Sequence, residues 1–144
     1  MSIEETHPMT TTDASTLVGL TVTHRHYVPY SHAHYAGDLV DGAYVLGLFG
    51  DVATEMCIRT DGDEGLFASY SDVQFQAPVR AGDVIEVEAR LARVGTRSRV
   101  LELTARVACR ARDGAGLAAS AAAVLDPPLV AVTATGTVVV PASP

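Results

Sequence analysis

Two kinds of hydrophobic pattern divide the first half of this chain. Residues 17–30 alternate between apolar and polar positions, which predicts a strand that ends at Pro29. Residues 43–59 are apolar almost throughout, and this length favours a helix over a strand, with Asp41 as its N-cap. The acidic, glycine-containing segment 60–65 predicts a turn that ends the helix.

Alternation returns in the second half. Strands are predicted over residues 66–78, 84–94, 98–110 and 129–141. The alanine-rich segment 111–128 is ambiguous between a short helix and a loop. A helix that is apolar nearly all round needs cover on most of its sides, and a curved antiparallel sheet provides it. The predicted fold is therefore α+β, the hotdog arrangement, and a dimer is the smallest assembly expected because a second sheet is needed to cover the helix completely.

The composition fits one folded domain of 144 residues, 48% of them hydrophobic and 19% charged. We expect a disordered tail over residues 1–16 and a single domain over residues 17–144. A net charge of −7 argues against nucleic acid or an anionic membrane as a partner, and no apolar run is long enough for a membrane span. Cys57 and Cys109 stand in apolar stretches and no signal peptide is evident, which predicts reduced thiols in a cytoplasmic protein.

Candidate catalytic groups share one side of the predicted helix. Ala43 and Gly47 leave room beside the helix for a thin ligand, and Asp51 and Glu55 continue the same stripe. Burial among apolar neighbours raises carboxyl pKa values, and a carboxyl group that holds a proton near neutral pH suits general acid–base catalysis. The alternative is that each acid simply pairs with an Arg or a His of the preceding loop.

The loop before the helix supplies further candidates, namely His34, Tyr35 and Asp38. The free N–H groups of Gly42 and Ala43 can bind a carbonyl oxygen that gains negative charge. This pattern suits a thioester whose α and β carbons lie along the helix, for enolate chemistry or hydrolysis. We expect no metal site, because only two histidines stand close together in this loop.

Four arginines near predicted turns are candidates for binding the phosphates of a pantetheine carrier: Arg80, Arg93, Arg97 and Arg99. Ordinary solvated strand ends explain them equally well. On an acidic chain, a local arginine patch would also be needed to dock an acyl carrier protein.

Residues 34–83, with their HY-x-G-x-LV-x-GA and FGDVATE segments, closely resemble the β-alanyl-CoA and 3-aminobutyryl-CoA ammonia lyases. The similarity continues through VGTRSR (94–99) and ATGTVVVP (134–141). Enzymes of this family add or remove an amine at the β carbon of an α,β-unsaturated acyl thioester. The resemblance implies that Glu55 or Asp51 moves the α-proton, beside the matching loop residues His34 and Tyr35. We expect no cofactor apart from the CoA or phosphopantetheine thioester that is the substrate.

The chain departs from the lyase pattern at two positions. Asn is usual where this chain has Asp38, and Arg is usual where it has Tyr44. A carboxylate at the first position also occurs in hotdog thioesterases, where it activates water or attacks the thioester carbonyl. A gain of hydrolysis is therefore expected, because a carboxylate can take a proton and an amide cannot.

Residues 23–44 also look like a bacterial branch of dual-function thioesterases from secondary metabolism. These add glycine to a crotonyl-type thioester on a carrier protein and then hydrolyse the product. The carboxylate of glycine then needs a cationic or hydroxyl partner. The candidates, whose alternative role is ordinary strand packing, are Arg25, His26, Tyr27 and Tyr30.

The sequence thus favours amine addition followed by hydrolysis, yielding an N-carboxymethyl-3-amino acid when the amine is glycine. The alternatives, in order, are an ammonia lyase without hydrolysis, a plain acyl thioesterase and a non-catalytic acyl-binding subunit. The expected partners are an acyl thioester, glycine or ammonia, and an acyl carrier protein or CoA. The expected assembly is a homodimer or a trimer of dimers.

Overall fold

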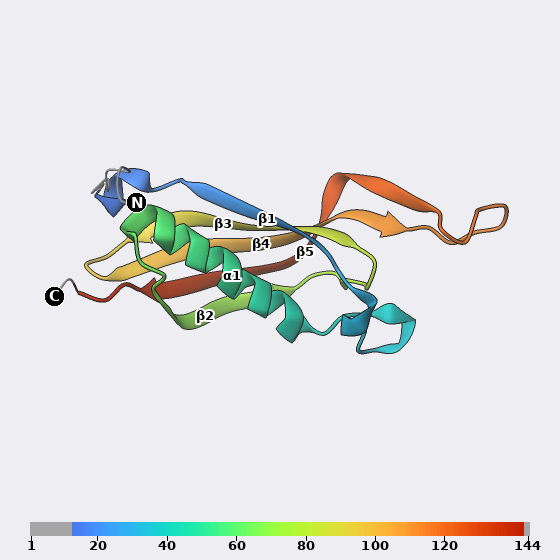
Figure 1. Ribbon diagram of the computed structural model, residues 1–144, viewed down its shortest axis with the longest axis horizontal. Helices are drawn as coiled ribbons and strands as arrows, with labels where there is room; N and C mark the ends of the chain where they lie inside the picture. Colours follow the sequence, from blue (N-terminus) through green and yellow to red (C-terminus); the bar gives the residue numbers. More distant parts are fainter. Residues whose placement is uncertain (1–12, 143–144) are drawn as a thin grey trace, which may run out of the picture.

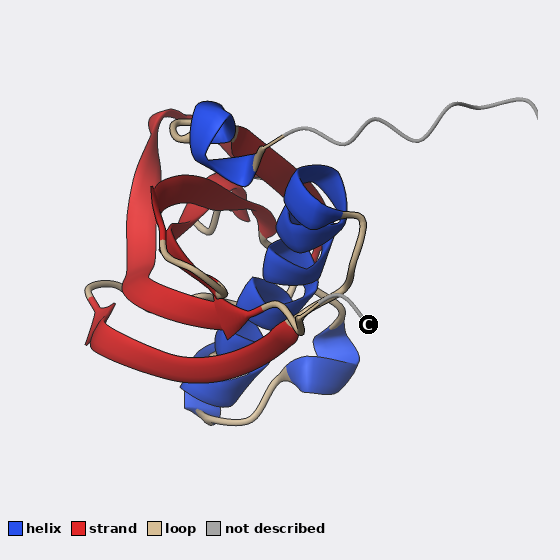
Figure 2. Ribbon diagram, turned by 90° about the vertical axis from the view of Figure 1, so that its left-hand side faces the viewer, coloured by secondary structure: helices blue, strands red, loops and turns tan. Residues whose placement is uncertain are grey.

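The computed structural model describes residues 13–142, which form one antiparallel sheet and one long helix. The strands are β1 (Thr21–Tyr27), β2 (Leu66–Phe75), β3 (Val84–Val94), β4 (Ser98–Ala111) and β5 (Ala122–Val139), in the sheet order β1-β3-β4-β5-β2. Helix α1 (Gly42–Asp61) lies along the concave face of this sheet (Figure 1). In the end view the sheet curls around the helix and leaves one side of it open (Figure 2). The predicted α+β hotdog arrangement is confirmed.

Local signals define both ends of α1. The Asp41 carboxylate accepts a hydrogen bond from the backbone N–H of Tyr44 at 3.0 Å, as expected of an N-cap. At the other end Gly62 has a φ of 65°, and its N–H donates to the carbonyl of Ile58. Glycine adopts this left-handed conformation without strain, so the turn after the helix ends it where the sequence predicts.

One face of α1 packs into the sheet. Its buried residues are Val45, Leu48, Phe49, Val52, Ala53, Met56, Cys57 and Thr60. They share a core with branched side chains of β3 and β4, among them Ile85, Leu91 and Leu103. Each large side chain buried in this way contributes roughly 1.5–3 kcal/mol, so this contact fixes the helix on the sheet. The opposite face, with Gly47 and Asp51, is exposed.

A hairpin arm extends beyond the body of the molecule (Figure 1). We use this name for residues 109–124, in which Cys109 of β4 pairs with Val124 of β5. The ambiguous segment 111–128 contains no helix, because β5 already starts at Ala122 and residues 112–121 form the exposed connection. Small residues without alternating polarity conceal this strand in the sequence.

The expected tail lies largely outside the described residues, because the structure describes nothing before residue 13. Ala14–Leu17 forms a short 3₁₀ helix in which Ala14 is buried, so regular structure begins before the predicted domain boundary at residue 17. Within residues 13–142, no helix has both the length and the apolar character needed to cross a membrane.

Candidate active site

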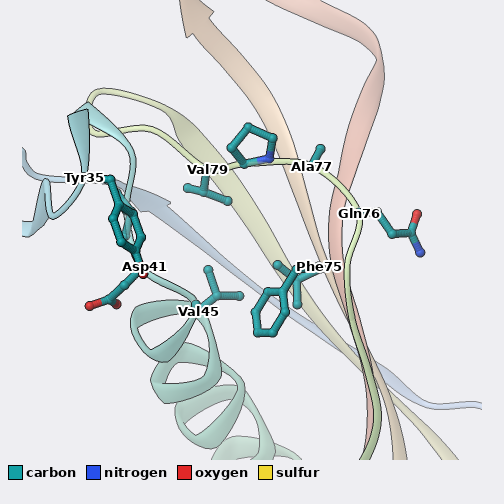
Figure 3. A pocket seen from close by; sticks show the side chains of 11 residues that line it. Tyr35, Asp41, Val45, Phe75, Gln76, Ala77 and Val79 are labelled. Atoms are coloured by element: carbon teal, nitrogen blue, oxygen red, sulfur yellow. The ribbon is translucent and has the colours of Figure 1, made fainter. Parts of the chain in front are cut away.

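A cavity of about 410 Å³ opens at the N-terminal end of α1 (Figure 3). Val45 of α1 and Phe75 of β2 lie on opposite sides of it and point toward one another, whereas Gln76 points away. Most of the lining is apolar, and its polar side chains are Tyr35, Asp41 and Gln76. An apolar cavity with a few polar groups at its edge is typical of a site for a small organic ligand.

Gly42 brings the backbone of the first helical turn to this cavity. A Cβ atom at this position would lie 2.6 Å from Cε1 of Phe75, so the aromatic ring can approach only because the residue is glycine. The first N–H groups of a helix have no partner inside it, and Asp41 caps the N–H of Tyr44. The N–H groups of Gly42 and Ala43 therefore remain to bind a carbonyl oxygen that gains negative charge.

The loop residues divide between the edge of the cavity and the surface. Tyr35 lines the cavity. The ring of His34 lies edge-on to the ring of Tyr35, with 4.6 Å between the two ring centroids. His34 Nδ1 is also 3.9 Å from the Asp41 carboxylate. Asp38 is exposed, has a φ of 61° and does not line the cavity. The structure thus brings together three polar side chains at the entrance and leaves Asp38 outside.

The two helix acids do not reach this cavity. A helix rises about 1.5 Å per residue, so Asp51 and Glu55 lie about 14 Å and 20 Å along the axis from Gly42. The β carbon of a thioester is only two bonds from its carbonyl carbon. A thioester held at Gly42 therefore cannot reach either acid of the same chain. The predicted slot beside Ala43 and Gly47 is wrong for a single chain, because this side of α1 faces outward.

Glu55 is held by two side chains. Arg59 donates from Nε to Oε2 at 2.7 Å, and Nε2 of His24 on β1 is 2.7 Å from Oε1. The hydrogen bond from Arg59, and then that from His24, holds the pKa of Glu55 below its usual value. The predicted rise in pKa is therefore wrong, since polar partners rather than apolar neighbours surround this carboxylate. The alternative, in which the acid simply pairs with an Arg or a His, describes Glu55 better. The histidine, however, comes from β1 and not from the loop before the helix.

His26 lies on the same face of β1 as His24, and their ring centroids are 6.1 Å apart. Burial, and then the charge of His24, lowers the pKa of His26, while the nearby Asp51 opposes this shift. The Nε2 atom of His26 is buried and has no hydrogen-bond partner among the described residues. The open side of α1 thus carries a group of titratable side chains.

The four residues expected to bind an amine or its carboxylate do not converge. Arg25 and Tyr27 lie on the face of β1 opposite to His26, and Arg25 pairs with Glu86 at 2.6 Å. The hydroxyl group of Tyr30 lies over the turn before β3, which places this side chain away from the strand. Alternation along the strand therefore separates these candidates, and they cannot all contact one carboxylate.

The four arginines also lie apart. Arg80 is next to the loop at the cavity end, where it forms a bridge with Leu39. The other three lie around the β3–β4 turn, near the last turn of α1. Arg99 is buried there in an ion pair with Asp61, so it is not available to a phosphate, whereas Arg97 lines a second cavity of about 570 Å³. Of the four candidates, Arg99 is thus excluded as a phosphate ligand, and Arg80 lies at a different end of the molecule from Arg93 and Arg97.

Metal binding has no support in the part of the chain that the structure describes. No group of three or more His, Cys, Asp or Glu side chains in residues 13–142 could hold a metal ion.

Comparison with known proteins identifies the family. Residues 39–109 match the family described as the Thioesterase superfamily. A 3-aminobutyryl-CoA ammonia lyase of Acetoanaerobium sticklandii is 52% identical over 109 residues, which cover 76% of this chain and 85% of that protein. The chain belongs to the hotdog thioesterase superfamily. It is an enzyme of the hotdog family, related to the ammonia lyases.

Solved structures agree with this assignment to the thioesterase superfamily. The β-alanyl-CoA:ammonia lyase from Clostridium propionicum matches with a TM-score of 0.79 at 35% identity, over 85% of this chain and 86% of that chain. A hexameric hotdog-fold thioesterase of Campylobacter jejuni matches with a TM-score of 0.67 at 16% identity, over 82% and 80% of the two chains. The second likeness shows the shared fold alone.

Several residues at the candidate site of this superfamily member were not predicted from its sequence. Arg59 follows Glu55 by four positions, a spacing that predicts an ion pair on a helix and could have revealed it. His24 was not among the predicted site residues, because nothing in the sequence indicates a contact with a residue 31 positions away. Asp41 was identified only as a helix cap, and Phe75 carries no local signal at all.

Proposed function

We propose that this enzyme removes ammonia from a 3-aminoacyl-CoA thioester, and adds it in the reverse direction, without hydrolysing the thioester. The observation that carries the proposal is the 52% identity to a 3-aminobutyryl-CoA ammonia lyase. The apolar cavity at the first turn of α1 supports it as a place for the acyl group. Glycine addition followed by hydrolysis, which the sequence analysis ranked first, has less support from these relatives.

The reaction needs an oxyanion-binding group and a base. The N–H groups of Gly42 and Ala43 would bind the thioester carbonyl oxygen, which makes the hydrogen on the α carbon more acidic. A carboxylate takes this proton, the C–H electron pair forms the double bond, and the bond from the β carbon to nitrogen breaks. The β-ammonium group leaves as neutral ammonia. The cationic thioester and the carboxylate anion thus give a neutral enoyl thioester, ammonia and a protonated carboxyl group.

In this proposal the base comes from a second copy of the chain. Glu55 is about 20 Å from Gly42 along its own helix, so the two cannot act on one thioester within one chain. Two α1 helices that run antiparallel across a two-fold axis would place Glu55 of each copy beside the first turn of the other. The exposed small residues Ala43 and Gly47 leave room for that approach. Glu55 is the better candidate because its two partners keep it ionised.

CoA is the proposed carrier, because both similar ammonia lyases act on CoA thioesters. Among the predicted phosphate-binding residues, Arg80, Arg93 and Arg97 are exposed and remain candidates. Arg97 lines the second cavity, at the opposite end of α1 from the first. An antiparallel second copy would bring that end of its helix toward the acyl cavity.

Product analysis by mass spectrometry tests the reaction. The enzyme is given 3-aminobutyryl-CoA alone, and crotonyl-CoA with ammonia or with glycine. Interconversion of 3-aminobutyryl-CoA and crotonyl-CoA with the thioester intact is the expected result. Free N-carboxymethyl-3-aminobutyrate would instead establish glycine addition with hydrolysis, and crotonate alone would establish a plain thioesterase.

Mixed dimers test whether two chains share the site. The Glu55→Gln variant lacks the base, and the Gly42→Val variant places a branched side chain against Phe75 at the mouth of the cavity. A heterodimer of the two, purified through different affinity tags, contains one site with neither substitution and should regain about half of the wild-type activity. A heterodimer as inactive as its parents would refute a shared site, provided that each parent retains its thermal midpoint.

A further inference from the structure

Both oxygens of the Glu55 carboxylate are occupied, each by a donor from a different element. Arg59 reaches Oε2 from one turn further along α1, and His24 reaches Oε1 from β1, each at 2.7 Å. An ionised carboxylate only accepts hydrogen bonds, so the hydrogen between His24 and Glu55 belongs to Nε2 of the histidine. The carboxylate plane is therefore fixed by two hydrogen bonds.

The two donors differ in how firmly they are held. The Arg59 side chain is long and 59% exposed, so water competes for its guanidinium group. The His24 side chain is 25% exposed and has only two rotatable bonds on a strand that pairs with β3 throughout its length. His24 therefore contributes most of the orientation, whereas Arg59 can move into solvent when Oε2 receives a proton.

We propose that His24 is a positioning residue, which holds Glu55 so that Oε2 faces the α-proton of the substrate. The inference rests on the proposed function, in which Glu55 is the base. No new bond to His24 is required. Glu55 Oε2 takes the proton while Oε1 keeps its hydrogen bond from Nε2, so the carboxylate remains in place throughout the transfer. Loss of this contact leaves the base present but free to rotate.

The test uses ammonia elimination from 3-aminobutyryl-CoA by the full-length enzyme. His24→Ala should lower kcat by about 10- to 100-fold, the range expected when a reacting group loses its alignment, with KM changed less than about threefold. His24→Gln, whose amide can still donate to Oε1, should recover most of that loss. Thr23→Ala is the matched control, because this neighbouring residue is exposed on the other face of β1.

An isotope effect separates positioning from partial unfolding. In His24→Ala, proton transfer becomes slower than the other steps, so substrate deuterated at the α carbon should show a larger isotope effect on kcat than in the wild type. A simple loss of folded protein would lower the rate with the isotope effect unchanged, and that result would overturn the proposal. Arg59→Ala, on the exposed side of the helix, should give a smaller loss of kcat in the same direction.

The failure of this inference differs from the failure of the proposed function. If Glu55→Gln abolishes elimination while His24→Ala matches Thr23→Ala, then Glu55 is the base and His24 does not position it. If Glu55→Gln retains elimination, the assignment of the base is wrong and the role of His24 falls with it. If neither the wild type nor any variant acts on the thioester, the proposed function and the role of His24 are both overturned.

Discussion

Arg99 at the start of β4 clamps Asp61 at the end of α1 through two parallel hydrogen bonds. Nε lies 2.9 Å from one carboxylate oxygen and Nη2 lies 2.7 Å from the other. The same guanidinium group also donates to the carbonyls of Gly95 and Ser98 in the β3–β4 turn. The last turn of the helix is thus tied to the end of the sheet that lies opposite the cavity at Gly42.

Removing this pair should destabilise the fold. The side chains of Asp61 and Arg99 are 12% and 8% exposed, so Asp61→Asn leaves a buried cation without its counter-ion and should cost about 3 kcal/mol in urea unfolding. Glu102→Gln is a suitable control, because it breaks an exposed pair with Arg90 and should cost less than about 1 kcal/mol. If both variants lost the same free energy of unfolding, burial would not explain the contribution of the Asp61–Arg99 pair.

The same pair predicts how stability depends on pH. The hydrogen bond from Arg99 holds the pKa of Asp61 below its usual value. A depressed pKa stabilises the folded state above the pKa of the unfolded chain, about 4, and this contribution is lost as the pH falls through the folded value. The free energy of unfolding of wild type and Asp61→Asn should therefore converge below about pH 4. A constant difference across this range would refute the link.

Phe75 should limit the length of the acyl group. Its ring forms one side of the cavity, against the first turn of α1, and it is 57% exposed. Phe75→Ala should raise kcat/KM for a six-carbon thioester relative to a four-carbon one by about tenfold, with Phe75→Leu in between. An unchanged chain-length profile, measured over acyl groups of increasing length, would place the acyl group elsewhere.

Asp38→Asn should separate hydrolysis from amine chemistry. Asp and Asn both tolerate the left-handed conformation found at this position, so the loop should keep its shape. The rate of elimination, measured from the absorbance of the enoyl product, should stay within about twofold of the wild-type rate. Asp38 lies outside the cavity, and a base elsewhere removes the α-proton. Any release of free CoA thiol should decrease. Parallel losses of both activities would show that Asp38 serves the common site.

Cys57 should be chemically inert in the folded protein. Burial raises the pKa of its thiol to about 11, so almost none of it is thiolate at pH 8. Iodoacetamide should therefore modify the half-buried Cys109 first, and Cys57 only in denaturant. Peptide mapping after timed labelling measures both rates. Fast labelling of Cys57 in the native protein would reveal local opening between α1 and the sheet.

The helix could be predicted because the residues that begin and end it are close to it in the sequence. The site could be predicted only in part, because it depends on contacts between residues far apart in the sequence. Asp41 and the glycine-containing turn carry their signals within a few residues of the helix ends, so both ends are confirmed. The strand of the arm was missed because Ala122 and its neighbours lack alternating polarity. The sequence gives no direct signal that Arg99 would fold onto a residue 38 positions earlier and become unavailable to a ligand.

The stripe of Ala43, Gly47, Asp51 and Glu55 shows the same limit. Spacing by four residues places Asp51 and Glu55 on one side of the helix, but does not tell which side faces the sheet. The hydrophobic residues decide that, and they occupy the other face almost completely. An enclosed slot beside the helix was therefore expected where the single chain has an open surface. The rise per residue of the helix shows that Gly42 and Glu55 of one chain lie too far apart to act on the same thioester.

The tip of the hairpin arm extends beyond the core of the fold (Figure 1). At its base the pairing changes register between Val107 and Cys109, and Arg110 anchors this base to the buried Asp83 and to the carbonyl of Pro78. The connection over residues 112–121 is exposed along nearly all its length. A foreign peptide or a fluorophore grafted between Gly114 and Gly116 should leave the sheet and helix intact, which makes this loop the natural attachment point for immobilising or imaging the protein.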